Sequence, residues 1–113
     1  MNTEGLTRAL GLCRRAGKIV CGTPMVIEAV RSEKNRPFIV IEAADSSDGT
    51  HKKLTDKCGF YGVKHTRVPL GTEELAHAVG KTGSVAALAV SDENLAALVE
   101  KNLVNTPSKE NLS

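Results

Sequence analysis

The chain has 113 residues and a mass of 12.0 kDa, with 41% hydrophobic and 25% charged residues. These values are typical of one globular domain and exclude a fibrous or disordered chain. The net charge of +2 does not by itself indicate a nucleic-acid partner. No apolar run approaches the roughly 18 residues of a membrane-spanning helix, and no secretory signal opens the chain. We therefore expect one cytoplasmic domain over residues 1–104, without a membrane partner, and a polar, frayed tail over 105–113.

The apolar spacing predicts five helices and four strands. Thr23 is predicted to cap the second helix with Pro24 in its first turn, and Thr72 to cap the fourth. In chain order we expect a helix through residues 6–13 that ends at Gly17, a strand over 18–21, a helix over 23–33, a strand over 38–44, a helix over 49–62, a strand over 64–70, a helix over 73–79, a strand over 84–90 and a helix over 93–103.

Two of the predicted strands are apolar without alternation, which is typical of strands that are covered on both faces. They are "FIVIEAA" over 38–44, which we place at the centre of the sheet, and "SVAALAV" over 84–90. Pro69 restricts the strand over 64–70 to an edge. Helices that alternate with four short strands predict an α/β fold, a three-layer α/β/α sandwich with a small mixed four-stranded sheet.

Catalytic and metal motifs are weak or missing. "GKT" at 80–82 resembles the end of a phosphate-binding loop, but it follows a helix and precedes a strand, the reverse of that motif. The three histidines have no partner at metal spacing, and we interpret them as solvent-facing or capping residues. Asp45 and Asp48 are explained as caps, and the three cysteines as reduced, mostly buried thiols; Cys58 we interpret as a packing residue. We expect no enzyme activity, cofactor or metal.

Positive charge is concentrated at the start of the chain. Residues 1–36 carry seven Lys and Arg against three Glu, a net charge of +4, whereas the remainder carries eight against ten, a net −2. Inside this segment, Gly22-Thr23-Pro24 opens a helix, and a helix N-terminus stabilises anions. Two interpretations stay open from spacing alone: a phosphate site, or a simple helix cap beside a solvated basic face. Aromatic residues make up only 3% of the chain, which argues against stacking of single-stranded bases.

Four segments in this order carry a family resemblance: "LGLCRRAGKIVCGTPMVIEAVRS", "HKKLTDKCGFYGV", "GTEELAHAVGK" and "VAALAVSDENLA". They resemble the L7Ae family of ribosomal proteins, in particular its bacterial YlxQ-like branch, over nearly the whole chain to about Leu103. The resemblance implies an α/β/α sandwich that binds RNA, typically the kink-turn, a sharply bent duplex with an internal loop. In that family the RNA site combines the turn before the second helix with the loop after the fourth.

The resemblance also assigns site residues. The turn element is Gly17, Lys18, Gly22, Thr23, Pro24, Met25 and Glu28, and the loop element is Lys81, Thr82, Gly83, Ser84 and Val85. Kink-turn binders usually place a polar amide, an acid and a lysine where this chain has Pro24, Met25 and Glu28, so the usual base-reading set is replaced. An acid such as Glu28 facing phosphates adds repulsion.

Our first hypothesis is a non-catalytic protein that binds structured RNA, kink-turn-like or ribosomal, and associates with ribosomes. It would bind the RNA backbone and recognise the shape of the RNA. The residues that would do so are Arg14, Arg15, Lys18, the Gly22–Pro24 turn, Arg31 and the Lys81 loop. The alternative is a protein-interaction adaptor on the same fold, with Met25 and Val26 as exposed apolar anchors.

Overall fold

The computed structural model describes residues 1–103, so the expected frayed tail lies outside the described residues. Within that range all nine predicted elements are present, with shorter strands than predicted. They are α1 (Thr3–Arg15), β1 (Ile19–Cys21), α2 (Thr23–Arg31), β2 (Ile39–Glu42), α3 (Asp48–Tyr61), β3 (Lys64–Arg67), α4 (Thr72–Ala78), β4 (Ala87–Val90) and α5 (Glu93–Leu103).

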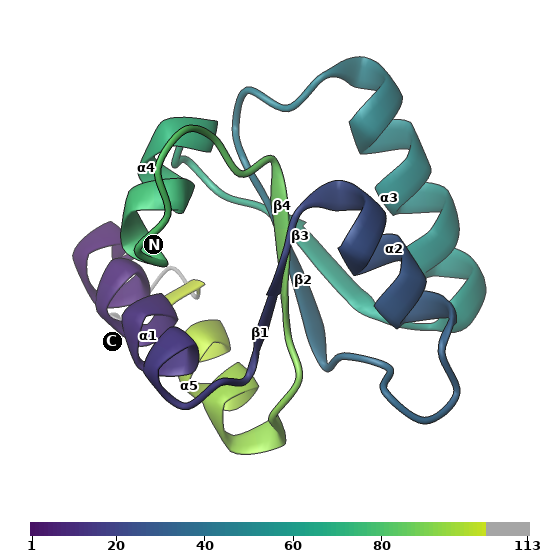
Figure 1. Cartoon of the computed structure of the whole chain (residues 1–113), viewed down its shortest axis with the longest axis horizontal. Coiled ribbons are helices and arrows are strands. Elements are labelled where there is room, and N and C mark those ends of the chain that lie inside the picture. The colour runs from purple at the N-terminus through teal and green to yellow at the C-terminus, as the bar shows by residue number, and fades with distance from the viewer. Residues whose placement is uncertain (104–113) are drawn as a thin grey trace, which may run out of the picture.

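The four strands form one mixed sheet in the order β1-β4-β2-β3. β4 is antiparallel to both β1 and β2, and β2 is parallel to β3. Helices α1, α4 and α5 cover one face of this sheet, whereas α2 and α3 cover the other (Figure 1). The predicted three-layer α/β/α sandwich is therefore confirmed, and so is the expected edge position of the third strand.

Side chains of the two inner strands alternate between two separate apolar clusters, as the period of a strand requires. On the α1/α4/α5 face lie Ile39 and Ile41 of β2 with Leu88 and Val90 of β4. On the α2/α3 face lies Val40, with two alanines of β4 opposite. Because both faces are covered, β2 and β4 are buried along their whole length, as their apolar runs predicted.

Two predicted helix caps are wrong by one residue. Gly22, not Thr23, is the N-cap of α2, and Gly71, not Thr72, is the N-cap of α4. In α4 the exposed N–H of Thr72 is satisfied from outside the helix, because the carboxylate of Asp45 accepts it at 2.8 Å. None of the helices in the part of the chain that the structure describes is long and apolar enough to cross a membrane.

The core makes a direct prediction about stability. Leu88 is fully buried in the middle of β4, whereas Leu12 on α1 is 41% exposed. We expect Leu88→Ala to lower the free energy of unfolding by about 3 kcal/mol, since a cavity is left in a packed core. Leu12→Ala, the matched control, should change it by less than about 0.5 kcal/mol. Urea denaturation measures both, and equal losses would contradict the two-faced core.

Candidate functional site

The turn between β1 and α2 is built on Gly22. Its φ of 96° lies in a region that side-chain-bearing residues rarely adopt, so a glycine is required there. Its N–H donates to the carbonyl of Ala87 at 2.9 Å, which ties the turn to the start of β4, and its carbonyl accepts from Val26 N–H. No side chain caps α2, so the first-turn N–H groups of Thr23 and Met25 lack intrahelical partners.

The loop between α4 and β4 lies beside this turn. Because β1 and β4 are antiparallel, with Cys21 opposite Leu88, the residues that lead into β4 lie next to the residues that leave β1 (Figure 1). Gly83 adopts a φ of 86°, and the N–H of Val85 donates to Thr72 O. Residues 81–84 are exposed and Val85 is buried. We call residues 22–25 together with 81–84 the turn–loop surface, which the buried Val85 does not join.

Two basic side chains border the turn–loop surface. Arg14 of α1 lies across Gly80, where an added Cβ would be 2.6 Å from the guanidinium carbon. Arg14 and Lys81 line one hollow of about 270 Å³ together with Cys21. Burial raises the pKa of the Cys21 thiol, and the Lys81 ammonium partly opposes that rise, as a nearby positive charge must.

Other predicted site residues lie elsewhere. Gly17 and Lys18 precede β1, at the opposite end of the strand from Gly22, where the carbonyl of Lys18 accepts from Ser91 N–H. Arg15 lines a groove between α1 and α5 with Arg8 and Lys101. The predicted set is therefore not one surface, because neighbours in sequence leave α1 in different directions.

The last two predicted residues lie along α2, toward its C-terminal end. Glu28 and Arg31 line a hollow with Tyr61, and Arg31 is the final residue of the helix. Eight residues at 1.5 Å per residue place Arg31 about 12 Å along the axis from Thr23. Glu28 and Arg31 thus lie away from the first turn of α2, where Gly22 and Thr23 are.

Lysines of α3 extend the positive charge from the other side. Lys53 and Lys57 line a shallow groove with Thr23, Pro24 and Ile27 of α2. The sequence places these lysines on the outer face of the third helix but does not connect them to the turn. The turn–loop surface consequently carries Lys81 and is flanked by Arg14 on one side and by two α3 lysines on the other.

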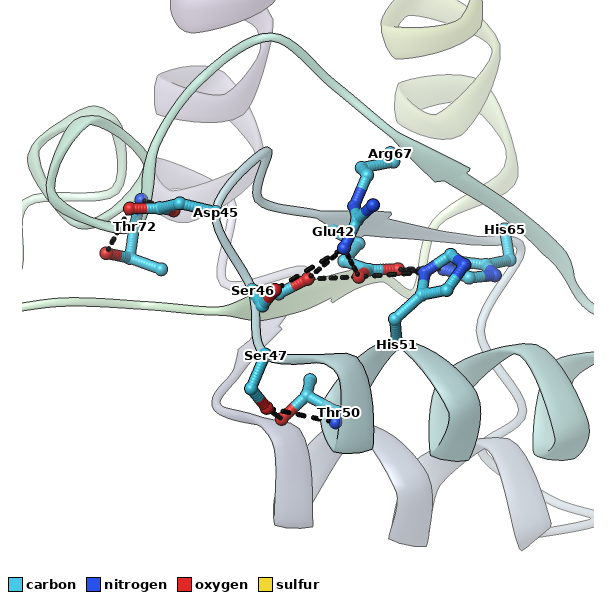
Figure 2. Close-up of polar contacts among 9 residues, drawn as sticks. All are labelled: Glu42, Asp45, Ser46, Ser47, Thr50, His51, His65, Arg67 and Thr72. Atoms are coloured by element: carbon cyan, nitrogen blue, oxygen red, sulfur yellow. Dashed lines mark hydrogen bonds and ion pairs between the residues drawn. The ribbon is translucent and has the colours of Figure 1, made fainter.

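A second polar cluster lies on the α2/α3 face of the sheet, around Glu42. This residue ends β2 and is fully buried, since alternation turns it to the same face as Val40. Its Oε1 lies 2.9 Å from Nδ1 of His51 on α3 and 2.7 Å from Nε2 of His65 on β3. Figure 2 shows both imidazoles directed at the carboxylate, one from helix α3 and the other from strand β3.

The other carboxylate oxygen has its own partners. Ser46 donates to Oε2, and Nη2 of Arg67 lies 3.3 Å from it (Figure 2). Burial alone would raise the pKa of the Glu42 carboxyl, but the hydrogen bonds from Ser46, His51 and His65 outweigh it and lower the pKa below its ordinary value. The buried charge is therefore compensated.

Sequence reasoning missed this cluster. The prediction for the central strand includes Glu42 in an apolar run without a separate role. The interpretation of the histidines as solvent-facing or capping is wrong for His65, whose side chain is only 12% exposed and bonded to Glu42. His77 does lie exposed on α4, as expected. The signal that could have revealed the cluster was a lone acid inside a strand predicted to be covered on both faces, because a buried carboxylate requires cationic or donor partners.

Two further interpretations of single residues are supported. Cys58 is buried in the α2/α3 cluster, and burial, with a smaller contribution from the Glu42 charge, raises its pKa to about 11. Such a thiol is a packing residue and a poor nucleophile at neutral pH. Asp45 is a cap, although it serves α4 across the loop. The interpretation of Asp48 as a cap is wrong, because Ser47 is the N-cap of α3 and Asp48 lies in its first turn.

Comparison with known proteins identifies the family. The model of the ribosomal protein L7Ae/L30e/S12e/Gadd45 family matches residues 4–100. The chain is 37% identical over 87 residues to "RNA-binding protein YlxQ" of Bacillus subtilis (strain 168), covering 77% of this chain and 83% of that protein. A protein of the same name from Enterococcus faecium is 33% identical over 84 residues, covering 74% and 79%. The chain belongs to the L7Ae/L30e/S12e/Gadd45 family.

Solved structures share the fold of this chain. A protein with unknown function from Bacillus halodurans C superimposes with a TM-score of 0.73 at 32% identity, covering 84% of this chain and 96% of that one. The Giardia lamblia 15.5kD RNA binding protein superimposes with a TM-score of 0.70 at 18% identity, covering 89% and 83%. At that identity the second likeness shows the fold alone.

The Glu42 cluster predicts a specific acid response. A carboxyl whose pKa is lower in the folded than in the unfolded state stabilises the fold above the unfolded value of about 4.3, and this contribution is lost as the pH falls below it. We expect Glu42→Gln to lower the free energy of unfolding at pH 7 by about 2 kcal/mol and to remove part of the decline between about pH 5 and 3.

Denaturant unfolding at several pH values measures this effect. Glu93→Gln, on the exposed start of α5, is the control and should retain the decline of the unsubstituted protein. A Glu42→Gln variant with unchanged stability at pH 7 and an unchanged acid profile would show that the buried carboxylate does not stabilise the fold.

Proposed function

We propose that this chain is a non-catalytic RNA-binding protein that grips structured RNA, kink-turn-like or ribosomal, at the turn–loop surface. The observation that carries the proposal is the convergence of the Gly22 turn, the Lys81 loop and Arg14 at one edge of the sheet. Family membership supports it, and two similar proteins are named RNA-binding proteins. A cytoplasmic protein that associates with ribosomes is the setting that fits this proposal.

The physical basis is the open N-terminus of α2. Its first-turn N–H groups and the positive end of the helix dipole favour a phosphate, and the absence of a side chain at Gly22 lets an RNA backbone approach closely. Arg14 and Lys81 add two full positive charges beside it. Such contacts fix orientation and register on the RNA but carry little sequence information.

Pro24 and Met25, at the start of α2, determine which contacts with RNA we expect. Pro24 and Met25 are exposed where kink-turn binders usually carry a polar amide and an acid, so the start of α2 offers the exposed base edges fewer hydrogen bonds. Recognition should therefore depend on the shape of the bent backbone more than on base identity. We propose a reduced preference for a standard kink-turn over other structured RNAs.

A salt titration tests the electrostatic contribution of Arg14 and Lys81 to RNA binding. We expect binding to a kink-turn RNA to weaken steeply with salt, and Lys81→Ala or Arg14→Ala each to reduce the slope of log affinity against log salt by about one. Lys34→Ala, an exposed lysine beyond the opposite end of α2, is the matched control and should leave the slope unchanged.

The same assay is performed with a mutated kink-turn and with plain duplex RNA. Similar affinities for the intact and the mutated kink-turn would support the reduced preference, and a strong preference for the intact kink-turn would refute it. No binding to any of the three at low salt would refute the proposed function itself.

An adaptor role has one observation in its favour, the exposure of Met25. Its side chain is 56% exposed at the start of α2, next to the exposed Pro24. The expected second anchor is wrong, because Val26 is fully buried between α2 and the sheet. A single methionine is a small apolar anchor, so RNA binding remains the better-supported function.

Met25→Glu separates the two functions. The substitution should weaken RNA binding through added negative charge at the phosphate-facing turn, and its deficit relative to wild type should shrink at higher salt because salt screens the added repulsion. If the surface is an adaptor, Met25→Glu abolishes a protein interaction that survives nuclease treatment. Co-purification with and without nuclease, compared between wild type and Met25→Glu, measures this; the RNA proposal requires that nuclease alone releases the partners.

A further inference from the structure

We propose that Glu42, His51 and His65 form a binding site for a divalent transition-metal ion of the zinc class. The three ligand atoms come from β2, α3 and β3 and all lie within 4.8 Å of one another. The site lies on the α2/α3 face of the sheet and shares no residue with the turn–loop surface, so the proposal does not depend on RNA binding. Sequence spacing did not predict it, because Glu42 is 9 residues from His51 and 23 from His65.

The donor set selects the kind of ion. Two imidazole nitrogens and one carboxylate oxygen suit Zn²⁺, Co²⁺ or Ni²⁺, whereas Mg²⁺ and Ca²⁺ prefer oxygen ligands alone. Ligands at about 2.0–2.2 Å from a tetrahedral ion lie about 3.3–3.5 Å apart. The measured 2.7 and 2.9 Å from Oε1 to the two nitrogens are shorter, and the widest separation among the three ligand atoms, up to 4.8 Å, is longer, so both imidazoles must shift away from Oε1 and toward one another.

Each imidazole can exchange the ring hydrogen that faces Glu42 for a bond to the metal ion. With no metal bound, each imidazole places a ring hydrogen on the nitrogen that faces Glu42, since the carboxylate can only accept. On binding, each of these hydrogens is released to solvent or transferred to the other ring nitrogen, and the freed lone pair binds the ion. The negative charge that two hydrogen bonds stabilise is then neutralised by the cation.

The surroundings orient the carboxylate and leave an entrance. Ser46 donates to Oε2, and Arg67 lies 3.3 Å from the same oxygen, so Oε1 remains for the ion. Such supporting contacts are typical of metal ligands. His51 is 44% exposed, which gives the ion access from solvent and leaves a fourth position for water. The positive charge of Arg67 opposes binding, so we expect a weaker site than a closed structural zinc site.

Cobalt titration of tag-free protein tests the proposal. We expect one Co²⁺ per chain with visible d–d absorption, displacement by Zn²⁺, and a rise in the thermal midpoint when Zn²⁺ is added. His51→Ala should lower the affinity for Co²⁺ at least about tenfold. His77→Ala, which removes an exposed histidine of α4 outside the cluster, is the control and should bind as the wild type does.

His51→Ala is the decisive variant, because the half-exposed side chain on the helix surface can be removed without opening the core. His65→Ala and Glu42→Gln should lose binding too, and their folding is checked by circular dichroism. No saturable binding of Co²⁺ or Zn²⁺ overturns the proposal, as does binding that His51→Ala leaves unchanged. A sulfur-to-cobalt charge-transfer band would assign the ion to the cysteines and overturn it as well.

Discussion

The antiparallel pairing of β4 with both β1 and β2 is the constraint on which the rest of the structure depends. Cys21 pairs with Leu88 and Glu42 pairs with Ala87, so β4 enters the sheet where β1 and β2 leave it. The backbone N–H groups of Gly22 and Ala43 donate hydrogen bonds to the carbonyls of Ala87 and Ala86, so the start of β4 is bonded to the chain on both sides. The turn before α2, the loop before β4 and the end of β2 are thereby brought to one edge, although they are far apart in the chain.

The same edge explains why a carboxylate is buried in an otherwise apolar sheet. Glu42 pairs with Ala87 of β4, whose small side chain lies on the same α2/α3 face of the sheet. A charge in this position is costly unless its oxygens are bonded, and the partners must come from elements that approach from other directions. His51 and His65 supply them from α3 and β3. The cluster therefore links three elements, and its hydrogen bonds fix the start of α3 against the sheet.

Much of the fold could be predicted because it is encoded locally. The apolar period located the helices and strands, and the two uninterrupted apolar runs became the inner strands of the sheet. The family resemblance implied that turn and loop act together, and the strand pairing brings them together. The wrong predictions, such as the helix caps, depend on how the backbone bends and on contacts between elements that are far apart in the chain. Side-chain preference favoured Thr23 as a cap, but the backbone bend at Gly22, with φ 96°, decides where α2 begins.

The basic N-terminal segment is the clearest case of sequence proximity without spatial proximity. Arg14 and Arg15 are adjacent, yet one lines a hollow with Lys81 and the other a groove with Lys101. The turn–loop surface instead gains much of its charge from Lys53 and Lys81, outside that segment. A few separated cations make a weak field, and long-range attraction alone selects poorly among polyanions. On the proposal that this surface binds RNA, selectivity would then depend on how closely a bent backbone fits the glycine turn at Gly22.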